Sequence, residues 1–144
     1  MFPMLPPQKF REIVFQLLYS HDFVPVETEE AVPFLMNELK VSKRNVREAH
    51  TRMLTILEKL PEIDAHIKAA SDVYAFERIS RVEKTLLRLG IFELLYDTAV
   101  PPLVAIAEGI RLCRKFGTRE SAEFVNAILD KVYKNASPAG TASL

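Results

Sequence analysis

Two groups of basic residues are the strongest concentration of chemistry in this sequence. One extends from Lys40 to Arg52 and contains a single carboxylate, Glu48, beside Lys40, Lys43, Arg44, Arg47 and Arg52. The other consists of Arg111, Arg114, Lys115 and Arg119. Cations presented together can contact the phosphates of a nucleic acid. A solvated helix face is the simpler interpretation of either group alone, so both interpretations stay open.

Residues that could perform catalysis or bind a metal are sparse. His21, His50 and His66 are scattered, with no HExxH or comparable ligand spacing. The only cysteine, Cys113, lies on an apolar helical stripe, where a buried and inert thiol is expected rather than a nucleophile. The sequence contains no glycine-rich phosphate loop. We therefore expect no enzymatic activity, no metal and no cofactor.

The composition indicates one soluble domain. The chain has 144 residues, 49% of them hydrophobic, and 19 basic residues balance 19 acidic ones. A single cysteine excludes an internal disulfide, which favours the reducing cytosol. The first residues, MFPMLPPQKF, lack the features of a signal peptide. The sequence contains no run of ~18 apolar residues, which is the length that a membrane-spanning helix needs. We expect a soluble cytoplasmic protein without a membrane span.

The elements that position these residues are predicted to be helices throughout. Only four glycines occur, and apolar residues recur at three- and four-residue steps, which is typical of an all-α fold. The first helix should begin after Pro6-Pro7. A second is expected near residues 27–33, beginning either at its acidic residues or close to Pro33. Ser42 should cap a third helix that ends at Pro61. A fourth should carry Ile63, Ile67, Ala70 and Tyr74 on one face.

Three further helices follow from local start and stop signals, so the total is about seven. Ser80 and Glu83 have the spacing of a capping box, which should start a helix that continues to Tyr96. Pro101-Pro102 should open the next helix. Gly117 is expected to end it in a left-handed conformation, and Thr118 to cap the last one. Residues 1–7 are expected to be flexible, residues 8–134 to form the domain, and residues 135–144 to be disordered.

Three stretches of the chain resemble the NusB transcription-antitermination family, in the family's order. QKFREIVFQLLYS is similar to the first helix of that family and RISRVEKTLLRLGIFELLYD to its central buried helix. VPPLVAIAEGIRLCRKFGTRESAEFVNAILDK is similar to its final helical pair. Residues 24–74 share only the helical pattern. The resemblance implies an all-α bundle of two subdomains. It also implies a factor that binds boxA RNA with NusE, within an RNA polymerase antitermination complex for ribosomal RNA transcription.

The resemblance also places an RNA surface on the first and last helices. Its residues would be Lys9, Arg11, Gln16, Tyr19, Glu120 and Phe124. The family's N-terminal segment is usually arginine-rich, whereas this chain offers only Lys9 and Arg11 there. Phe124 would either stack a base or belong to the apolar stripe of its helix. Tyr19 has a similar alternative as a core residue with an exposed hydroxyl.

The resemblance assigns NusE binding to two carboxylates, Glu77 and Glu83, which would complement a basic ribosomal protein. Glu83 also belongs to the expected capping box, and both roles can coexist. Two other functions stay open: a protein-binding module whose RNA affinity is weak or depends on its partner, and a NusB-like module associated with a ribosomal RNA methyltransferase. Family members occur as monomers or homodimers, so the resemblance leaves the oligomeric state open.

Overall fold

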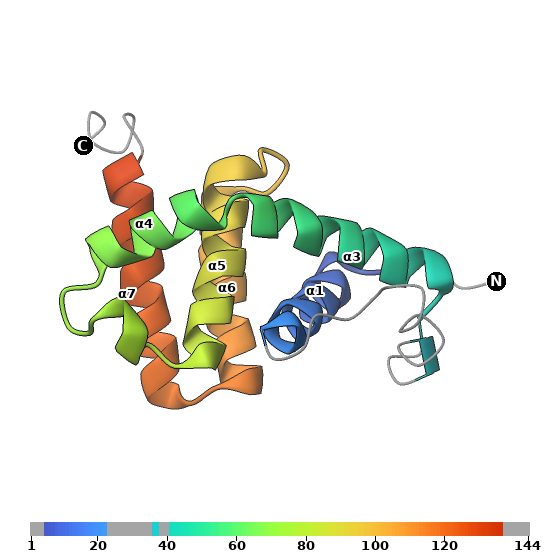
Figure 1. Cartoon of the computed structure of the whole chain (residues 1–144), viewed down its shortest axis with the longest axis horizontal. Coiled ribbons are helices and arrows are strands. Elements are labelled where there is room, and N and C mark those ends of the chain that lie inside the picture. The colour runs from blue at the N-terminus through green and yellow to red at the C-terminus, as the bar shows by residue number, and fades with distance from the viewer. Residues whose placement is uncertain (1–4, 23–35, 38–40, 137–144) are drawn as a thin grey trace. The chain divides into compact units, whose positions relative to one another are not determined.

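The computed structural model describes residues 5–22, 36–37 and 41–136, and within them it contains helices and no strand (Figure 1). The elements are α1 (Pro7–His21), α3 (Lys43–Glu58), α4 (Leu60–Ala70), the 3-10 turn η1 (Phe76–Arg78), α5 (Arg81–Tyr96), α6 (Pro102–Phe116) and α7 (Arg119–Ala136). The all-α prediction is therefore confirmed. The helix expected near residues 27–33 and the tail from residue 137 onward lie outside the described residues.

The chain divides into two compact units, Met1–Glu58 and Lys59–Leu144, which we call the first and the second unit. In the first unit, α1 packs against α3. Pro7 starts α1 because proline is tolerated in the first helical turn. Each helix buries one apolar stripe, made of Ile13, Val14, Phe15 and Leu18 on α1 and of Val46, Ala49, Met53 and Ile56 on α3.

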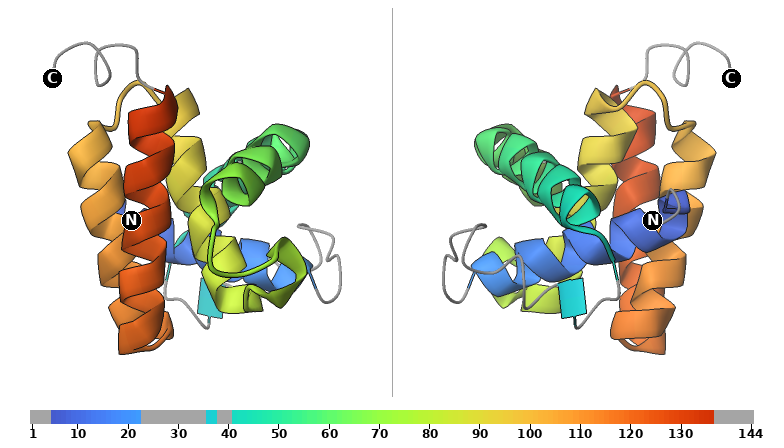
Figure 2. Two further views of the ribbon diagram at one scale, coloured as in Figure 1. Left: turned by 90° about the vertical axis from the view of Figure 1, so that its left-hand side faces the viewer. Right: turned by 90° about the vertical axis from the view of Figure 1, so that its right-hand side faces the viewer.

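The second unit is built on α5, α6 and α7, which lie side by side, while α4 runs across α5 and α7 (Figures 1 and 2). The predicted capping box at the start of α5 is confirmed. The Glu83 amide donates to Ser80 Oγ over 3.1 Å, and the Ser80 amide donates to Glu83 Oε1 over 3.2 Å. Arg88 of α5 makes two 2.9 Å hydrogen bonds to the Asp64 carboxylate and so joins α5 to α4.

Three predictions about helix ends are wrong. Pro61 does not end the third helix: α3 stops at Glu58, and Pro61 lies in the first turn of α4, where its missing N–H costs no hydrogen bond. Tyr74 does not continue α4, which ends at Ala70, because Ser71 adopts an extended conformation with ψ 106°. Gly117 ends α6 with φ −121° and ψ −148°, and this negative φ shows that its conformation is not left-handed.

Candidate RNA and partner interface

Two of the residues predicted to bind RNA share one side of α1. Gln16 and Tyr19 are three positions apart, and both are half-buried. The Tyr19 ring stacks on Phe15, with ring centroids 6.0 Å apart and an angle of 23° between the ring planes. Phe15 belongs to the buried stripe of α1, so this contact fixes the Tyr19 ring against the core. Tyr19 therefore combines an anchored ring with partial exposure, as a surface residue that receives a ligand would.

The two cations of α1 differ in their accessibility. Lys9 is half-buried, whereas Arg11 is only 8% exposed and lies beside the equally buried Glu12. A guanidinium covered to this extent cannot present its N–H donors to a phosphate without moving. The expectation that both residues offer their charge to RNA therefore fits Lys9 better than Arg11, whose burial favours a structural role.

The start of α7 carries the other two residues predicted to bind RNA. Thr118 caps the helix by accepting a hydrogen bond from the Ser121 amide over 3.1 Å, as predicted. Glu120 is exposed in the first turn, where the helix dipole favours a carboxylate. Phe124 follows one turn later and is half-buried, so it is neither a core residue nor a freely exposed one.

An aromatic contact that the sequence did not reveal covers part of Phe124. The Tyr74 ring meets the Phe124 ring edge-on, with centroids 5.4 Å apart and an interplanar angle of 72°. Tyr74 is itself 49% exposed. Its loop is held in place because Ser71 Oγ donates to the Tyr74 carbonyl over 2.6 Å and Asp72 pairs with Lys131 of α7. The polar pair Ser71-Asp72 after the apolar stripe of α4 was the one sequence signal for this loop.

The two carboxylates predicted to bind NusE lie before and within the first turn of α5. Glu77 is exposed on η1, and Glu83 is half-buried at the third position of α5. Only one oxygen of Glu83, Oε1, accepts the capping hydrogen bond. Basic groups surround the ring of Phe76, the residue before Glu77: Lys84 Nζ is 4.3 Å and Lys68 Nζ 5.0 Å from its centroid. The surface around Glu77 is therefore of mixed charge, because residues distant in sequence bring their cations to it.

The single thiol of the chain is inaccessible. The Cys113 side chain is fully buried, and its thiol points toward the Ser121 carbonyl at 3.9 Å. Burial, with a smaller contribution from the nearby Glu83 charge, raises the pKa of the Cys113 thiol to about 12. In the described part of the chain, no group of three or more His, Cys, Asp or Glu residues could hold a metal ion. In that same part, no helix combines the length and apolarity needed to cross a membrane.

This shifted pKa predicts a loss of stability in alkali. The thiol stays protonated in the folded protein up to about pH 12, but in the unfolded chain it ionises near its ordinary value of about 8.5. Between these values the unfolded state binds fewer protons, so the free energy of unfolding falls by up to about 1.4 kcal/mol per pH unit. Urea titrations from pH 7 to 10 should show this slope in the natural chain and a shallower one in Cys113→Ala. Equal slopes would contradict the assignment.

The comparison with known protein families decides the identity of the chain. A family model described as "NusB family" matches residues 8–134. The chain belongs to the NusB family. Relatives within this family include the transcription antitermination protein NusB of Chlamydia pneumoniae, which is 39% identical over 132 residues, or 92% of this chain and 82% of the relative. The protein of the same name from Lachnoclostridium phytofermentans is 38% identical over 127 residues, or 87% of this chain and 96% of the relative.

Solved NusB structures share the fold. NusB from T. maritima superposes with a TM-score of 0.76 at 30% identity, covering 98% of this chain and all of that one. A chain from a structure of antitermination factors NusB and NusE in complex with dsRNA superposes with a TM-score of 0.74 at 25% identity, covering 89% of this chain and 96% of that one. These similarities extend over both units of this NusB-family chain.

Proposed function

We propose that this chain is a transcription antitermination factor that binds NusE and, with it, boxA-type RNA. The observation that carries the proposal is similarity over 89% of the chain to a protein solved with NusE and dsRNA. The anchored ring of Tyr19 and the partly exposed aromatic pair Tyr74–Phe124 support it, because single-stranded RNA is recognised largely by stacking on aromatic side chains. The proposed role is non-enzymatic and cytoplasmic, in an RNA polymerase complex that transcribes ribosomal RNA.

The proposal is tested by reconstitution. Purified chain and NusE should form a complex in solution, and the mixed pair should bind a boxA oligonucleotide more tightly than a scrambled RNA of equal length. Light scattering would report the oligomeric state before and after each addition. Absence of NusE binding, together with absence of boxA binding by the mixed pair, would refute the proposed function.

A second candidate function is a protein-binding module whose RNA affinity depends on its partner. The burial of Arg11 favours it, because α1 then offers fewer accessible cations for phosphate contacts. Each lost phosphate contact lowers the salt dependence by about 0.7 in log–log slope on a single strand. RNA affinity measured with and without NusE separates the two functions: in the second, binding is detected only when NusE is present.

The two functions of Glu83 can be separated by substitution. In Glu83→Gln the amide oxygen can still accept from the Ser80 amide, because glutamine also completes a capping box. This variant should keep its thermal stability but associate with NusE a few-fold more slowly at low salt, since a steering charge is lost. Glu83→Ala should lose the cap as well, at a cost of about 0.3–1.5 kcal/mol.

Stopped-flow association and thermal unfolding measure the two effects independently. Glu77→Gln, which changes an exposed carboxylate outside the capping box, is the matched control for a purely electrostatic effect. Unchanged NusE association in both glutamine variants would remove these carboxylates from the proposed interface.

A further inference from the structure

The loop between α4 and η1 presents an aromatic side chain that the second unit does not bury. Tyr74 is 49% exposed, and the neighbouring Val73 is 75% exposed. A single exposed apolar residue is ordinary on a protein surface. Here the exposed ring contacts a second partly exposed ring, that of Phe124 on α7, with centroids 5.4 Å apart. Two segments far apart in the sequence thus form one small aromatic surface.

The loop keeps the Tyr74 ring in place. Ser71 Oγ donates a hydrogen bond to the Tyr74 carbonyl over 2.6 Å, which closes the loop on itself. Asp72 pairs with Lys131 and so joins the loop to α7, the helix that carries Phe124. An exposed ion pair of this kind contributes little to stability, but it adds a second point of attachment. A ring that is ordered before its ligand arrives loses little conformational entropy on binding.

The angle between the two rings suits one flat ligand. The ring planes of Tyr74 and Phe124 are inclined by 72° to each other. A planar base that lies parallel to one ring therefore presents its edge to the other ring. Aromatic groups attract each other both in offset stacks and edge to face. The pair thus forms a corner in which a single base would contact both rings.

The acidic residue beside this corner disfavours a phosphate as its occupant. Glu120 is exposed, and it lies four positions before Phe124 on the same side of α7. Its carboxylate repels a phosphate but can accept a hydrogen bond from the amino group of a base. The corner is therefore suited to a base and not to the RNA backbone.

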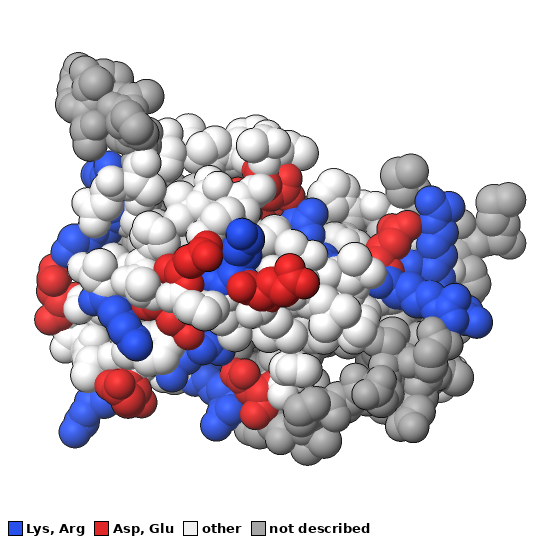
Figure 3. Space-filling view, turned by 45° about the horizontal axis from the view of Figure 1, so that its top comes forward, with Lys and Arg blue, Asp and Glu red and all other residues white. Residues whose placement is uncertain are grey.

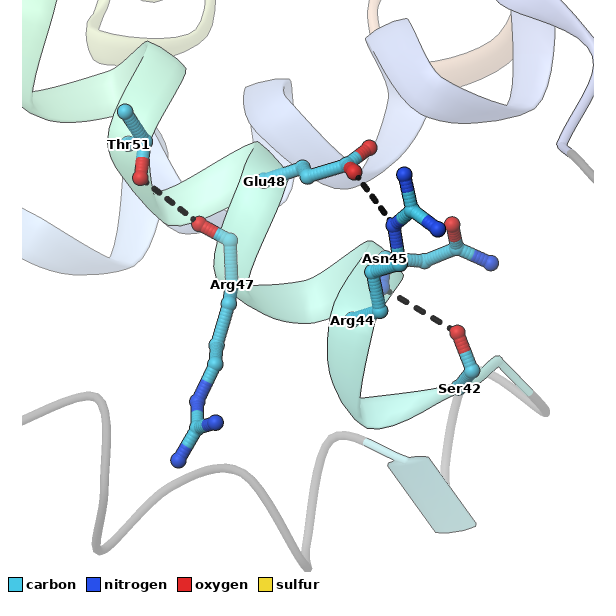
Figure 4. A network of polar contacts seen from close by, with 6 residues as sticks. All are labelled: Ser42, Arg44, Asn45, Arg47, Glu48 and Thr51. Atoms are coloured by element: carbon cyan, nitrogen blue, oxygen red, sulfur yellow. Dashed lines mark hydrogen bonds and ion pairs between the residues drawn. The ribbon is translucent and has the colours of Figure 1, made fainter.

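Charged side chains form local pairs in both units. Over the second unit, at the left of Figure 3, Lys and Arg side chains lie among Asp and Glu side chains. At the start of α3, Arg44 Nε donates to Glu48 Oε1 over 2.9 Å, and Ser42 Oγ accepts from the Asn45 amide over 3.1 Å (Figure 4). Because the chain also has no net charge, its long-range attraction for phosphate is weak. Stacking should then supply a larger share of the RNA affinity.

We propose that Tyr74 contacts RNA itself and holds one unpaired base in the corner that it forms with Phe124. This inference rests on the proposed function, which brings RNA to α7. RNA is the occupant that the surface favours, because every base has a flat π-face and stacks on an aromatic side chain whatever the sequence. The corner is also continuous with Glu120 and Phe124, the expected RNA-binding residues of α7.

The test compares Tyr74→Leu, Phe124→Leu and the double variant, each in complex with NusE. Tyr74→Leu should weaken RNA binding by about fivefold or more and leave the log–log salt slope unchanged, because no phosphate contact is lost. The double variant should bind more weakly than Phe124→Leu by a similar factor. Low salt keeps this weak binding measurable. Tyr133→Leu, which changes a half-buried tyrosine further along α7, is the matched control and should bind normally.

RNAs that lack one base at a time locate the contact. Removing the base in the corner should weaken binding by the natural complex but change that of Tyr74→Leu much less. Equal affinities of Phe124→Leu and the double variant would mean that Tyr74 acts only through Phe124, which refutes the inference while the proposed function stands. Weaker NusE binding by Tyr74→Leu would also refute it, because the ring would then belong to the protein interface. If the natural complex binds no RNA, both fail.

Discussion

Replacing Leu129 by alanine is expected to lower the free energy of unfolding by about 2–5 kcal/mol. Leu129 lies on α7 and is fully buried. Its Cδ atoms fill the space that two glycines leave open on the neighbouring helices: an added Cβ would lie 3.0 Å from Leu129 Cδ2 at Gly90 of α5 and 2.7 Å from Cδ1 at Gly109 of α6. Truncation therefore leaves a cavity where three helices meet, and the helices cannot close it without shifting together.

Substitution of Gly109 tests whether this glycine and Leu129 are in contact. Gly109→Ala alone should be neutral or destabilising, because its Cβ meets Leu129 Cδ1 at 2.7 Å. In the Leu129→Ala background that atom is absent, so the same change should recover about 1 kcal/mol from helix propensity and partial filling of the cavity. Urea unfolding of the four proteins of this cycle measures the coupling. Additive effects would mean that Gly109 and Leu129 are not in contact.

Replacing Phe124 by alanine is expected to weaken RNA binding by the complex with NusE by about 1–3 kcal/mol, or roughly 5- to 150-fold. The half-buried ring is in T-shaped contact with the Tyr74 ring, which limits its orientation before RNA arrives. A stacking surface that is ordered in advance loses little conformational entropy on binding. Phe124→Leu keeps an apolar side chain on α7 but removes the aromatic face, so it should lose most of the RNA affinity while preserving the fold.

Two variants of Tyr74 show whether it positions Phe124. Tyr74→Phe retains the edge contact and should bind RNA like the natural chain, whereas Tyr74→Ala should lose part of the affinity that Phe124→Ala loses. Fluorescence anisotropy with labelled RNA gives the dissociation constants, and thermal unfolding confirms that each variant is folded. Natural RNA affinity in Phe124→Leu would assign Phe124 to the apolar stripe of α7 instead.

Local signals were sufficient to predict most helix starts. The capping box at Ser80 and Glu83, the Ser42 and Thr118 caps, and the prolines that open α1 and α6 all act within four residues of the chain. Helix ends were less predictable. Pro61 is compatible both with ending a helix and with starting one, and only the conformation of Lys59, with φ −98° and ψ 3°, shows that a new helix begins there.

The sequence by itself determined the fold class, the family and the cluster of cations on α3, because periodicity, caps and charge are properties of neighbouring residues. Only the tertiary structure decided which charges and rings are accessible. It buries Arg11, brings Tyr74 onto Phe124 across fifty positions of sequence, and links Arg88 to Asp64. Such contacts depend on how α4, α5 and α7 pack. The energy of packing is a sum over many side chains, so no single sequence motif predicts it. The residues of the RNA surface were therefore suggested by resemblance, but their exposure was set by the fold.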